Sequence, residues 1–256
     1  MKLAFREYGS GQPLIILHGL FGQSDNWNTL AKRFGEKSFH VFTLDLRNHG
    51  LSPHSNEWNY KVMADDVKEF IQEHQLKDPI ILGHSMGGKV GMFFELQNPG
   101  IAKKLIVADI APRAYASHHD VVLKALSAVD FNKIKTRKEA EVVLNEFIPD
   151  FGTKQFLLKN IYWKDAANTQ MDWRFNLKVI DKEYSNISAE VPDSKSNIET
   201  LFIRGERSNY ICESDPADIK KHFPNYRLVT IKDSGHWIHA EKPNEFFESA
   251  LEFIKA

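Results

Sequence analysis

The chain has 256 residues, of which 42% are hydrophobic and 26% are charged, as in an ordinary globular protein. Lys and Arg total 33 and Asp and Glu total 34, a formal net charge of -1, and no basic stripe points to a nucleic-acid surface. The single cysteine, Cys212, excludes a disulfide within the chain and a cysteine-rich metal site.

Six short apolar runs predict buried strands: residues 14–17, 41–44, 80–82, 105–108, 200–203 and 227–231. Helical patterns follow the first three runs, and a last helix is predicted over residues 243–254. After the first run, for example, Trp27, Leu30, Ala31 and Phe34 lie at the spacing of one helix face. Unbroken apolar strands alternating with amphipathic helices predict an α/β fold whose mostly parallel sheet is flanked by helices.

Residues 112–195 break this rhythm. They contain helix-like segments at 121–129 and 137–147, no convincing strand and many aromatic residues. We therefore expect a helical cap over 112–195, inserted between the last strands of an α/β core formed by residues 1–111 and 196–256. Ligands of open α/β sheets bind beyond the carboxyl ends of the strands, where such a cap would cover them.

Aromatic residues supply the candidates for a substrate pocket. Trp163, Trp173 and Phe175 lie in the cap segment, and Phe21 and Trp237 lie in two loops of the core. The alternative for each of them is that the ring only packs the cap against the sheet, because buried aromatic rings are mostly core.

The strongest chemical signal is the motif Gly-His-Ser-Met-Gly at residues 83–87, directly between a predicted strand and a predicted helix. A serine on so tight a turn has its hydroxyl lifted out of the fold at the cost of a strained backbone, and its neighbours at two residues' distance must be small. Ser85 is therefore predicted to be a nucleophile. The alternative is a glycine-rich turn with an idle serine.

A second glycine-rich loop, His-Gly-Leu-Phe-Gly at residues 18–22, leaves the first predicted strand. The amide after the nucleophile, that of Met86, opens a helix and can stabilise a developing oxyanion. The Leu20 amide is the candidate second donor. A turn that merely needs glycine is the alternative.

His236 is the candidate general base among eleven histidines, because it follows the last predicted strand in a loop at the same edge as Ser85. His239 could join it in binding a metal ion, but no carboxylate or cysteine cluster supports this, and no metal is expected.

The acid is predicted to be Asp109, at the end of the strand 105–108. Many enzymes with this motif carry the acid one strand later, but residues 205–209 read Gly-Glu-Arg-Ser-Asn, with serine where aspartate would be expected. Glu206 is the alternative there. The order Ser85, Asp109, His236 matches that of the α/β hydrolases, and an imidazole would partner an otherwise costly buried carboxylate.

Together these motifs resemble the α/β-hydrolase superfamily, and most closely the bacterial YbfF-type esterases and the abhydrolase-domain-containing proteins. The resemblance rests on residues 45–52, 83–89, 109–112, 173–177 and 235–243. It implies hydrolysis of carboxylic esters, with acyl-CoA thioesters as a plausible substrate type, and agrees with Asp109 as the acid.

The expected activity is therefore a cofactor-free serine hydrolase that cleaves small or medium acyl esters or thioesters through an acyl-enzyme. The expected partner is a small molecule rather than nucleic acid or membrane. No apolar run approaches the roughly 20 residues that span a bilayer, and the first residues are charged too early for a signal peptide, so a cytoplasmic location is expected. The alternatives are a lyase or C–C hydrolase on the same scaffold, or a receptor with little turnover.

Overall fold

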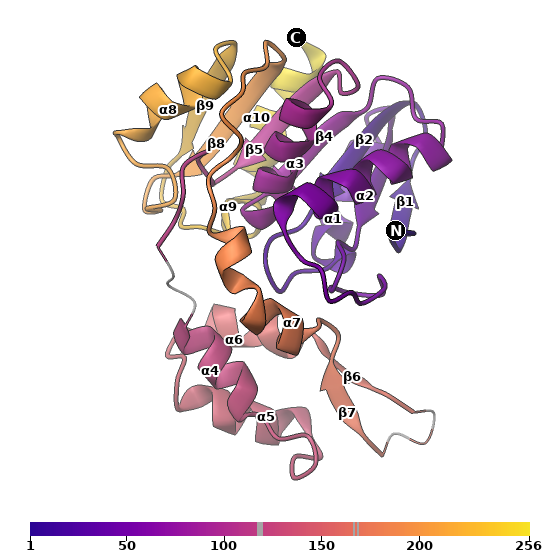
Figure 1. Ribbon diagram of the computed structural model, residues 1–256, viewed down its shortest axis with the longest axis vertical. Coiled ribbons are helices and arrows are strands. Elements are labelled where there is room, and N and C mark those ends of the chain that lie inside the picture. The colour runs from indigo at the N-terminus through magenta and orange to yellow at the C-terminus, as the bar shows by residue number, and fades with distance from the viewer. Residues whose placement is uncertain (117–119, 166, 168) are drawn as a thin grey trace.

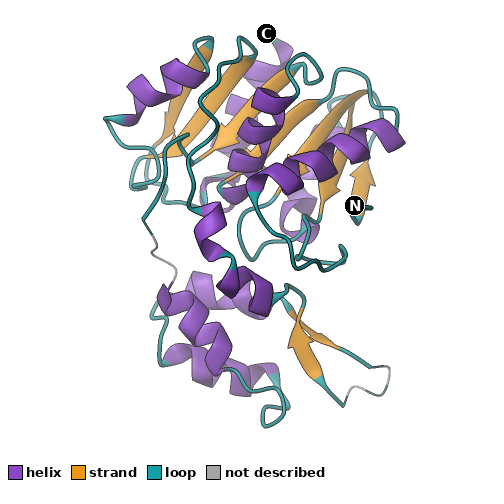
Figure 2. Ribbon diagram, in the orientation of Figure 1, coloured by secondary structure: helices purple, strands orange, loops and turns teal. Residues whose placement is uncertain are grey.

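The computed structural model describes residues 1–116, 120–165, 167 and 169–256. Its centre is a seven-stranded sheet with the order β1-β3-β2-β4-β5-β8-β9 (Figures 1 and 2). The strands are β1 (Phe5–Tyr8), β2 (Gln12–Leu17), β3 (Phe39–Leu44), β4 (Ile80–His84), β5 (Lys104–Ala108), β8 (Glu199–Gly205) and β9 (Tyr226–Ile231).

Six of these strands are parallel, and β1 pairs antiparallel with β3 at one edge. The six apolar runs expected from the sequence are all strands, whereas β1 was not predicted. The register aligns the carboxyl ends of the central strands, with His84 opposite Ala108 and Ala108 opposite Ile203. Residues that follow β4, β5 and β8 are thereby brought to one edge of the sheet.

Helices cover both faces of the sheet because alternate strand residues belong to two different apolar clusters. In β2, Ile15 and Leu17 join the cluster under the helices α2, α3 and α8, while Leu14 and Ile16 join the cluster under α1 and α10. Figure 1 shows α2 and α3 in front of the sheet. The helices are α1 (Asn28–Gly35), α2 (Tyr60–Glu73), α3 (Met86–Gln97), α8 (Asp215–His222), α9 (Ile238–Glu241), α10 (Pro243–Lys255) and the 3-10 helix η1 (Ser24–Trp27).

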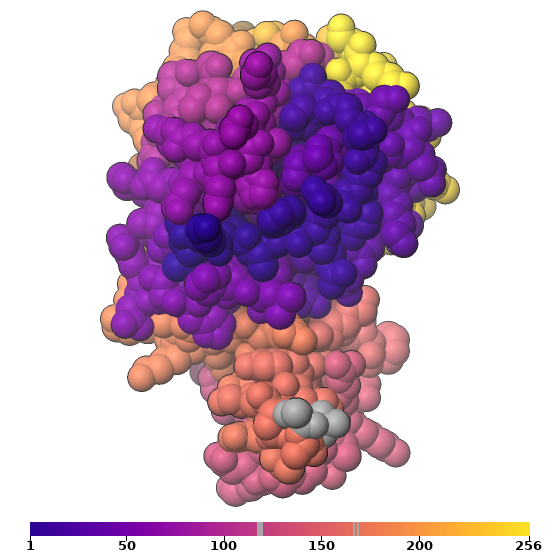
Figure 3. Space-filling model, turned by 90° about the vertical axis from the view of Figure 1, so that its right-hand side faces the viewer, coloured from indigo at the N-terminus to yellow at the C-terminus, as the bar shows by residue number. Residues whose placement is uncertain are grey.

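The chain between β5 and β8 forms a separate lobe below the sheet, which Figure 3 shows from the side as a narrower extension. We call this lobe the cap; the boundaries of 112 and 195 remain a prediction, and 117–119, 166 and 168 lie outside the described residues. Its elements are α4 (Asp120–Ala128), α5 (Arg137–Asn145), α6 (Phe151–Leu158), β6 (Ile161–Trp163), β7 (Met171–Trp173), α7 (Leu177–Lys182) and the 3-10 helix η2 (Tyr184–Ile187).

The cap contains a two-stranded antiparallel hairpin, β6 with β7, so the expectation of no strand between 112 and 195 was wrong. Each strand has three residues, which is too short for alternation to stand out in a segment rich in aromatic residues.

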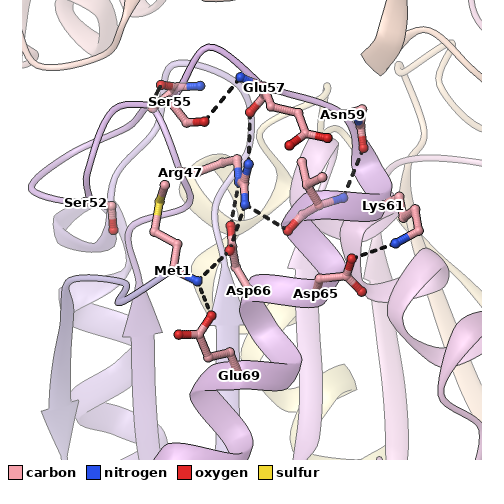
Figure 4. A network of polar contacts seen from close by, with 12 residues as sticks. Met1, Arg47, Ser52, Ser55, Glu57, Asn59, Lys61, Asp65, Asp66 and Glu69 are labelled. Atoms are coloured by element: carbon pink, nitrogen blue, oxygen red, sulfur yellow. Dashed lines mark hydrogen bonds and ion pairs between the residues drawn. The ribbon is translucent and has the colours of Figure 1, made fainter.

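The loop after β3, residues 45–58, is clamped to α2 by a buried ion pair (Figure 4). The Arg47 guanidinium donates to both carboxylate oxygens of Asp66, at 2.6 and 2.8 Å, and to the Glu57 carbonyl at 2.9 Å. Two-pronged pairing of this kind fixes direction as well as distance. The ion pair therefore fixes the position of the loop 45–58 relative to α2.

Candidate active site

Ser85 occupies the turn between β4 and α3, with φ of 52° and ψ of -118°. The turn is tight enough that only glycine fits two residues to either side. A Cβ on Gly83 would lie 2.2 Å from the Gly87 carbonyl oxygen, and one on Gly87 would lie 2.3 Å from the Leu17 carbonyl oxygen. A positive φ at a non-glycine residue stores strain, which is characteristic of functional positions. The structure thus has the strand–turn–helix geometry that the motif predicts.

His236 and Asp109 are brought together although 127 residues separate them in the chain. The His236 Nδ1 lies 2.7 Å from Oδ2 of Asp109, and because a carboxylate only accepts, Nδ1 carries the proton. The other ring nitrogen, Nε2, is then the basic one. The His236 side chain is 24% exposed and that of Asp109 is fully buried. The imidazole thus lies between a buried carboxylate and the solvent-accessible side.

Two further donors surround the Asp109 carboxylate. The Gly205 N–H donates to Oδ1 at 3.1 Å, and the Ser208 hydroxyl donates to Oδ2, the oxygen that also accepts from His236. Burial raises the pKa of the Asp109 carboxyl to about 7, while these hydrogen bonds and the charge of Arg204 act to lower it. A poorly hydrated carboxylate gains most from a neighbouring cation, here an imidazolium at His236.

Glu206, the alternative acid, does not take this place. Its carboxylate accepts from the Asp233 N–H at 3.0 Å, and its side chain is exposed. Ser208, two residues later, occupies the position after β8 where an aspartate would be expected. Its hydroxyl donates to the carboxylate of Asp109.

Two aromatic neighbours hold His236 in place. The ring of Tyr210 stacks on the imidazole with centroids 3.8 Å apart and planes 18° from parallel. The Nε2–H of His84, the residue before the nucleophile, donates to the His236 carbonyl at 2.9 Å. The elbow and the histidine loop are thereby joined directly, and neither contact was predicted from the sequence.

The loop of residues 18–22 lies against the elbow. A Cβ on Gly19 would be 3.4 Å from the Ser85 Cβ. The Gly19 carbonyl accepts from the Gly22 N–H at 2.9 Å and from His18 Nδ1 at 2.7 Å. Because carbonyl and N–H point in opposite directions in a trans peptide, these bonds also fix the direction of the Leu20 N–H.

His18 is held as the Nδ1–H tautomer because its Nε2 accepts from the Leu46 N–H at 3.0 Å. Burial lowers the pKa of His18 to about 4, so the ring stays neutral and keeps both hydrogen bonds. Met86 is the first residue of α3, where a backbone N–H has no acceptor within the helix. Gly19, the residue before Leu20, thus lies beside the Ser85 side chain, and Met86 follows Ser85 at the start of α3.

Three of the five candidate pocket aromatics contact one another, and the other two lie elsewhere. Phe21 is buried against Phe175 with ring centroids 5.0 Å apart, and Trp173 stacks on Phe175 at 5.4 Å within the cap. Trp237, next to the base, packs at 5.4 Å on Phe156 of α6. Trp163, on β6, is the remaining candidate and is 42% exposed.

A cavity of about 610 Å³ opens between α4, the hairpin and α7 of the cap, and His54 of the core loop 45–58 also lines it. Trp173 and Phe175 are among its lining residues, and Ser85, Asp109 and His236 are not. The cavity is therefore distinct from the cluster of these three residues.

Within the described part of the chain, no group of three or more His, Cys, Asp or Glu side chains is placed to hold a metal ion. His239 packs instead between the rings of Trp27, at 4.3 Å, and His84, at 4.5 Å. No helix among the described residues is both long and apolar enough to cross a bilayer.

Comparisons with known proteins identify the family of the chain. The family model of the alpha/beta hydrolase fold matches residues 12–243. Esterase YbfF of Escherichia coli is 32% identical over 246 residues, covering 96% of this chain and 94% of that protein. The sn-1-specific diacylglycerol lipase ABHD11 of Danio rerio is 35% identical over 259 residues, covering 96% of this chain and 80% of that protein.

A solved structure described as a marine microorganism esterase superposes with a TM-score of 0.95 at 42% identity, covering 99% of both chains. The family match spans most of the chain, and relatives above 30% identity cover nearly all of it. The chain belongs to the α/β-hydrolase family, among the esterases related to YbfF and the abhydrolase-domain proteins.

Proposed function

We propose that this carboxylic ester hydrolase cleaves small or medium acyl esters or thioesters through an acyl-enzyme formed on Ser85. The observation that carries the proposal is the 2.7 Å hydrogen bond between His236 and Asp109 beside the strained elbow serine. A serine hydroxyl attacks only when a base takes its proton, and a base is effective only when a third group fixes its tautomer.

In the first half of the reaction, Nε2 of His236 takes the proton of the Ser85 hydroxyl as its oxygen attacks the acyl carbonyl. The Leu20 and Met86 amides stabilise the resulting oxyanion, and Asp109 stabilises the imidazolium. The imidazolium then protonates the departing alcohol or thiol. A water molecule, deprotonated by the same imidazole, releases the acid and restores Ser85.

The relatives and the site together support the proposed substrate class. One relative is named an esterase and another a diacylglycerol lipase, so both act on carboxylic esters. Nothing in the mechanism distinguishes an alcohol from a thiol as leaving group, because both depart with the imidazolium proton. Acyl-CoA thioesters therefore belong to the proposed substrate range, with no cofactor required.

Turnover of p-nitrophenyl esters from acetate to octanoate, and of acyl thioesters of the same lengths, tests this function. We expect acid release by the wild-type protein and a loss of about 10³–10⁴-fold in kcat for Asp109→Asn, because the amide cannot stabilise the imidazolium. Asp181→Asn, on α7 in the cap, is the matched control and should retain activity.

Two outcomes would contradict the proposal. Stoichiometric labelling of Ser85 by a fluorophosphonate without turnover of any ester or thioester would favour the receptor or lyase alternatives. Equal turnover by the wild type and Asp109→Asn would remove Asp109 from the mechanism.

A further inference from the structure

Asn160 of the cap is bonded to the loop that carries the Leu20 amide. It lies between α6 and β6, is 1% exposed, and its Nδ2 donates to the Phe21 carbonyl at 2.9 Å. The same nitrogen lies 3.3 Å from the carbonyl oxygens of Phe156 and Leu157. A cap side chain therefore reaches through the interface to the backbone of residues 18–22.

The orientation of the Asn160 amide follows from its neighbours. All three partners of Nδ2 are carbonyl oxygens, which can only accept, so the nitrogen must face them. The opposite atom, Oδ1, is buried and has no hydrogen-bond partner within the described residues. An unpaired buried acceptor costs free energy, so the favourable contribution of this side chain comes from its donor.

Two peptide units, joined to each other by a hydrogen bond, lead from Asn160 to the Leu20 N–H. The Phe21 carbonyl and the Gly22 N–H belong to one peptide, whose N–H donates to the Gly19 carbonyl at 2.9 Å. The Gly19 carbonyl and the Leu20 N–H belong to the second peptide unit, which accepts this hydrogen bond. Because each trans peptide is rigid, holding the Phe21 carbonyl orients the Gly22 N–H, which in turn orients the Leu20 N–H. Such a chain of hydrogen bonds also polarises each member in the same sense.

The residue Phe21 itself needs external support because its backbone is strained, with φ of 58°. Its N–H donates to Nε2 of His49 at 3.3 Å, and His49 Nδ1 donates to the Arg47 carbonyl in the loop clamped to α2. The core thus holds one side of Phe21, and the cap holds the other through Asn160.

We propose that Asn160 is a positioning residue through which the seated cap orients the Leu20 amide and so completes the oxyanion hole. The proposal rests on the function proposed above. It makes the cap part of the catalytic apparatus and not only a cover, because removing the Asn160 donor frees the far end of the two-peptide chain.

The test compares Asn160→Leu, which removes the donor at similar volume, with Asn186→Leu. Asn186 is a matched control, since it is also a cap asparagine whose Nδ2 donates to a core carbonyl, that of Trp58 at 3.2 Å. For each protein, kcat and KM for a p-nitrophenyl ester and the inhibition constant of a trifluoromethyl ketone are measured. The ketone is bound as an oxyanion, so it reports the hole directly.

We expect Asn160→Leu to lower kcat about 10–100-fold, less than the 10²–10³-fold expected for removing an oxyanion donor itself. KM should change less than about 3-fold, and the inhibition constant of the ketone should rise in proportion to the loss of kcat/KM. Asn186→Leu should leave kcat, KM and the inhibition constant at wild-type values. A purely structural role for Asn160 would not move the ketone in step with kcat/KM.

Wild-type kcat and ketone affinity in Asn160→Leu would overturn this inference alone. Absent turnover by the wild type would overturn the proposed function and the inference with it. If Asn160→Leu does not fold, Asn160→Ala takes its place, and failure of both to fold would assign Asn160 to stability and contradict the inference.

Discussion

The Asp109 carboxylate combines full burial with three donors, and one of them, the Ser208 hydroxyl, sets its proton affinity without touching the reacting atoms. Burial raises the pKa of Asp109, and the Ser208 hydrogen bond opposes this effect. Since hydrogen bonding to a carboxylate favours its charged form, the serine keeps the Asp109–His236 pair in the singly protonated form that catalysis needs.

Replacing Ser208 by alanine should move the acid limb of the kcat/KM profile to higher pH. Without the hydroxyl the pKa of Asp109 rises further, so the pair takes up its second proton at a higher pH. The profile is measured between pH 5 and 9 for the wild type, Ser208→Ala and Ser208→Thr, which retains a hydroxyl. An acid limb of Ser208→Ala that stays in place or moves to lower pH would contradict the interpretation.

The residues of the site that could be predicted are those whose local chain has a signature. Ser85 is flanked by obligatory glycines, and His236 and Asp109 each follow a recognisable strand. Ser208 and Tyr210 could not be predicted as partners of the site. The hydrogen bond of Ser208 joins it to Asp109, 99 residues away in the chain, and Tyr210 contacts His236 only through ring stacking. Only the serine in place of an expected aspartate offered a signal.

At the scale of elements, five of the six parallel strands were predictable because burial on both faces makes each a run of apolar residues. The sixth, β9, is a partly buried edge strand that was still recognised from Leu228, Val229 and Ile231. The edge strand β1 was missed, since three of its four residues are exposed and it has no such run. The hairpin β6–β7 was missed for its length. Short or one-sided strands are defined by their partners, which the local sequence does not contain.

Two chain segments connect the cap to the core, one near residue 113 and one near residue 189, and Lys89 of α3 contacts both. Its Nζ donates to the Arg113 carbonyl at 2.7 Å and to the Ala189 carbonyl at 2.5 Å, and the side chain is fully buried. Burial lowers the pKa of Lys89 to about 7, with Arg113 acting in the same direction and Asp218 and Glu190 opposing. The protonation state of Lys89 therefore affects its hydrogen bonds to both connections between the cap and the core.

Lys89→Met should remove a pH-dependent part of the stability. The pKa of Lys89 is about 7 in the fold and 10.5 when unfolded, so the unfolded chain binds the proton between these values and the wild type gains stability as pH rises. The gain is on the order of 5 kcal/mol across the whole interval. Urea unfolding at pH 6.5, 8 and 9.5 measures it.

The quantity to compare is the difference in unfolding free energy between wild type and Lys89→Met, which should grow in favour of the wild type with pH. Lys133→Met, at an 85% exposed side chain, is the control and should show a constant difference. A constant difference for Lys89→Met as well would contradict the shifted pKa.

For the whole molecule, buried neutral histidines set the stability in acid. Burial lowers the pKa of His18 to about 4 and of His49 to about 3, and it lowers the pKa of His84 and His239 well below the ordinary value of 6.5. In each case the folded state binds fewer protons than the unfolded state below pH 6.5. Stability is therefore present above that pH and lost as pH falls.

We expect the unfolding free energy to fall steeply below pH 6.5, by up to about 5 kcal/mol per pH unit when all four histidines contribute. Asp109 and Glu95 oppose this trend, because burial raises the pKa of each carboxyl and so favours the folded state as pH falls, but they are two groups against four. Urea unfolding at pH 7.5, 6.0 and 5.0 gives the slope. A stability that is flat over this range would show that the histidines are already protonated in the fold.

The most direct test of the account is the mass of the intact protein after reaction with a fluorophosphonate, followed by mapping of the modified peptide. The account predicts one adduct per wild-type chain, located on Ser85, and none on Ser85→Ala. Ser127→Ala, a serine of α4 in the cap, should label as the wild type does. An unlabelled folded wild type, or an adduct that persists in Ser85→Ala, would contradict the assignment of Ser85 as the nucleophile.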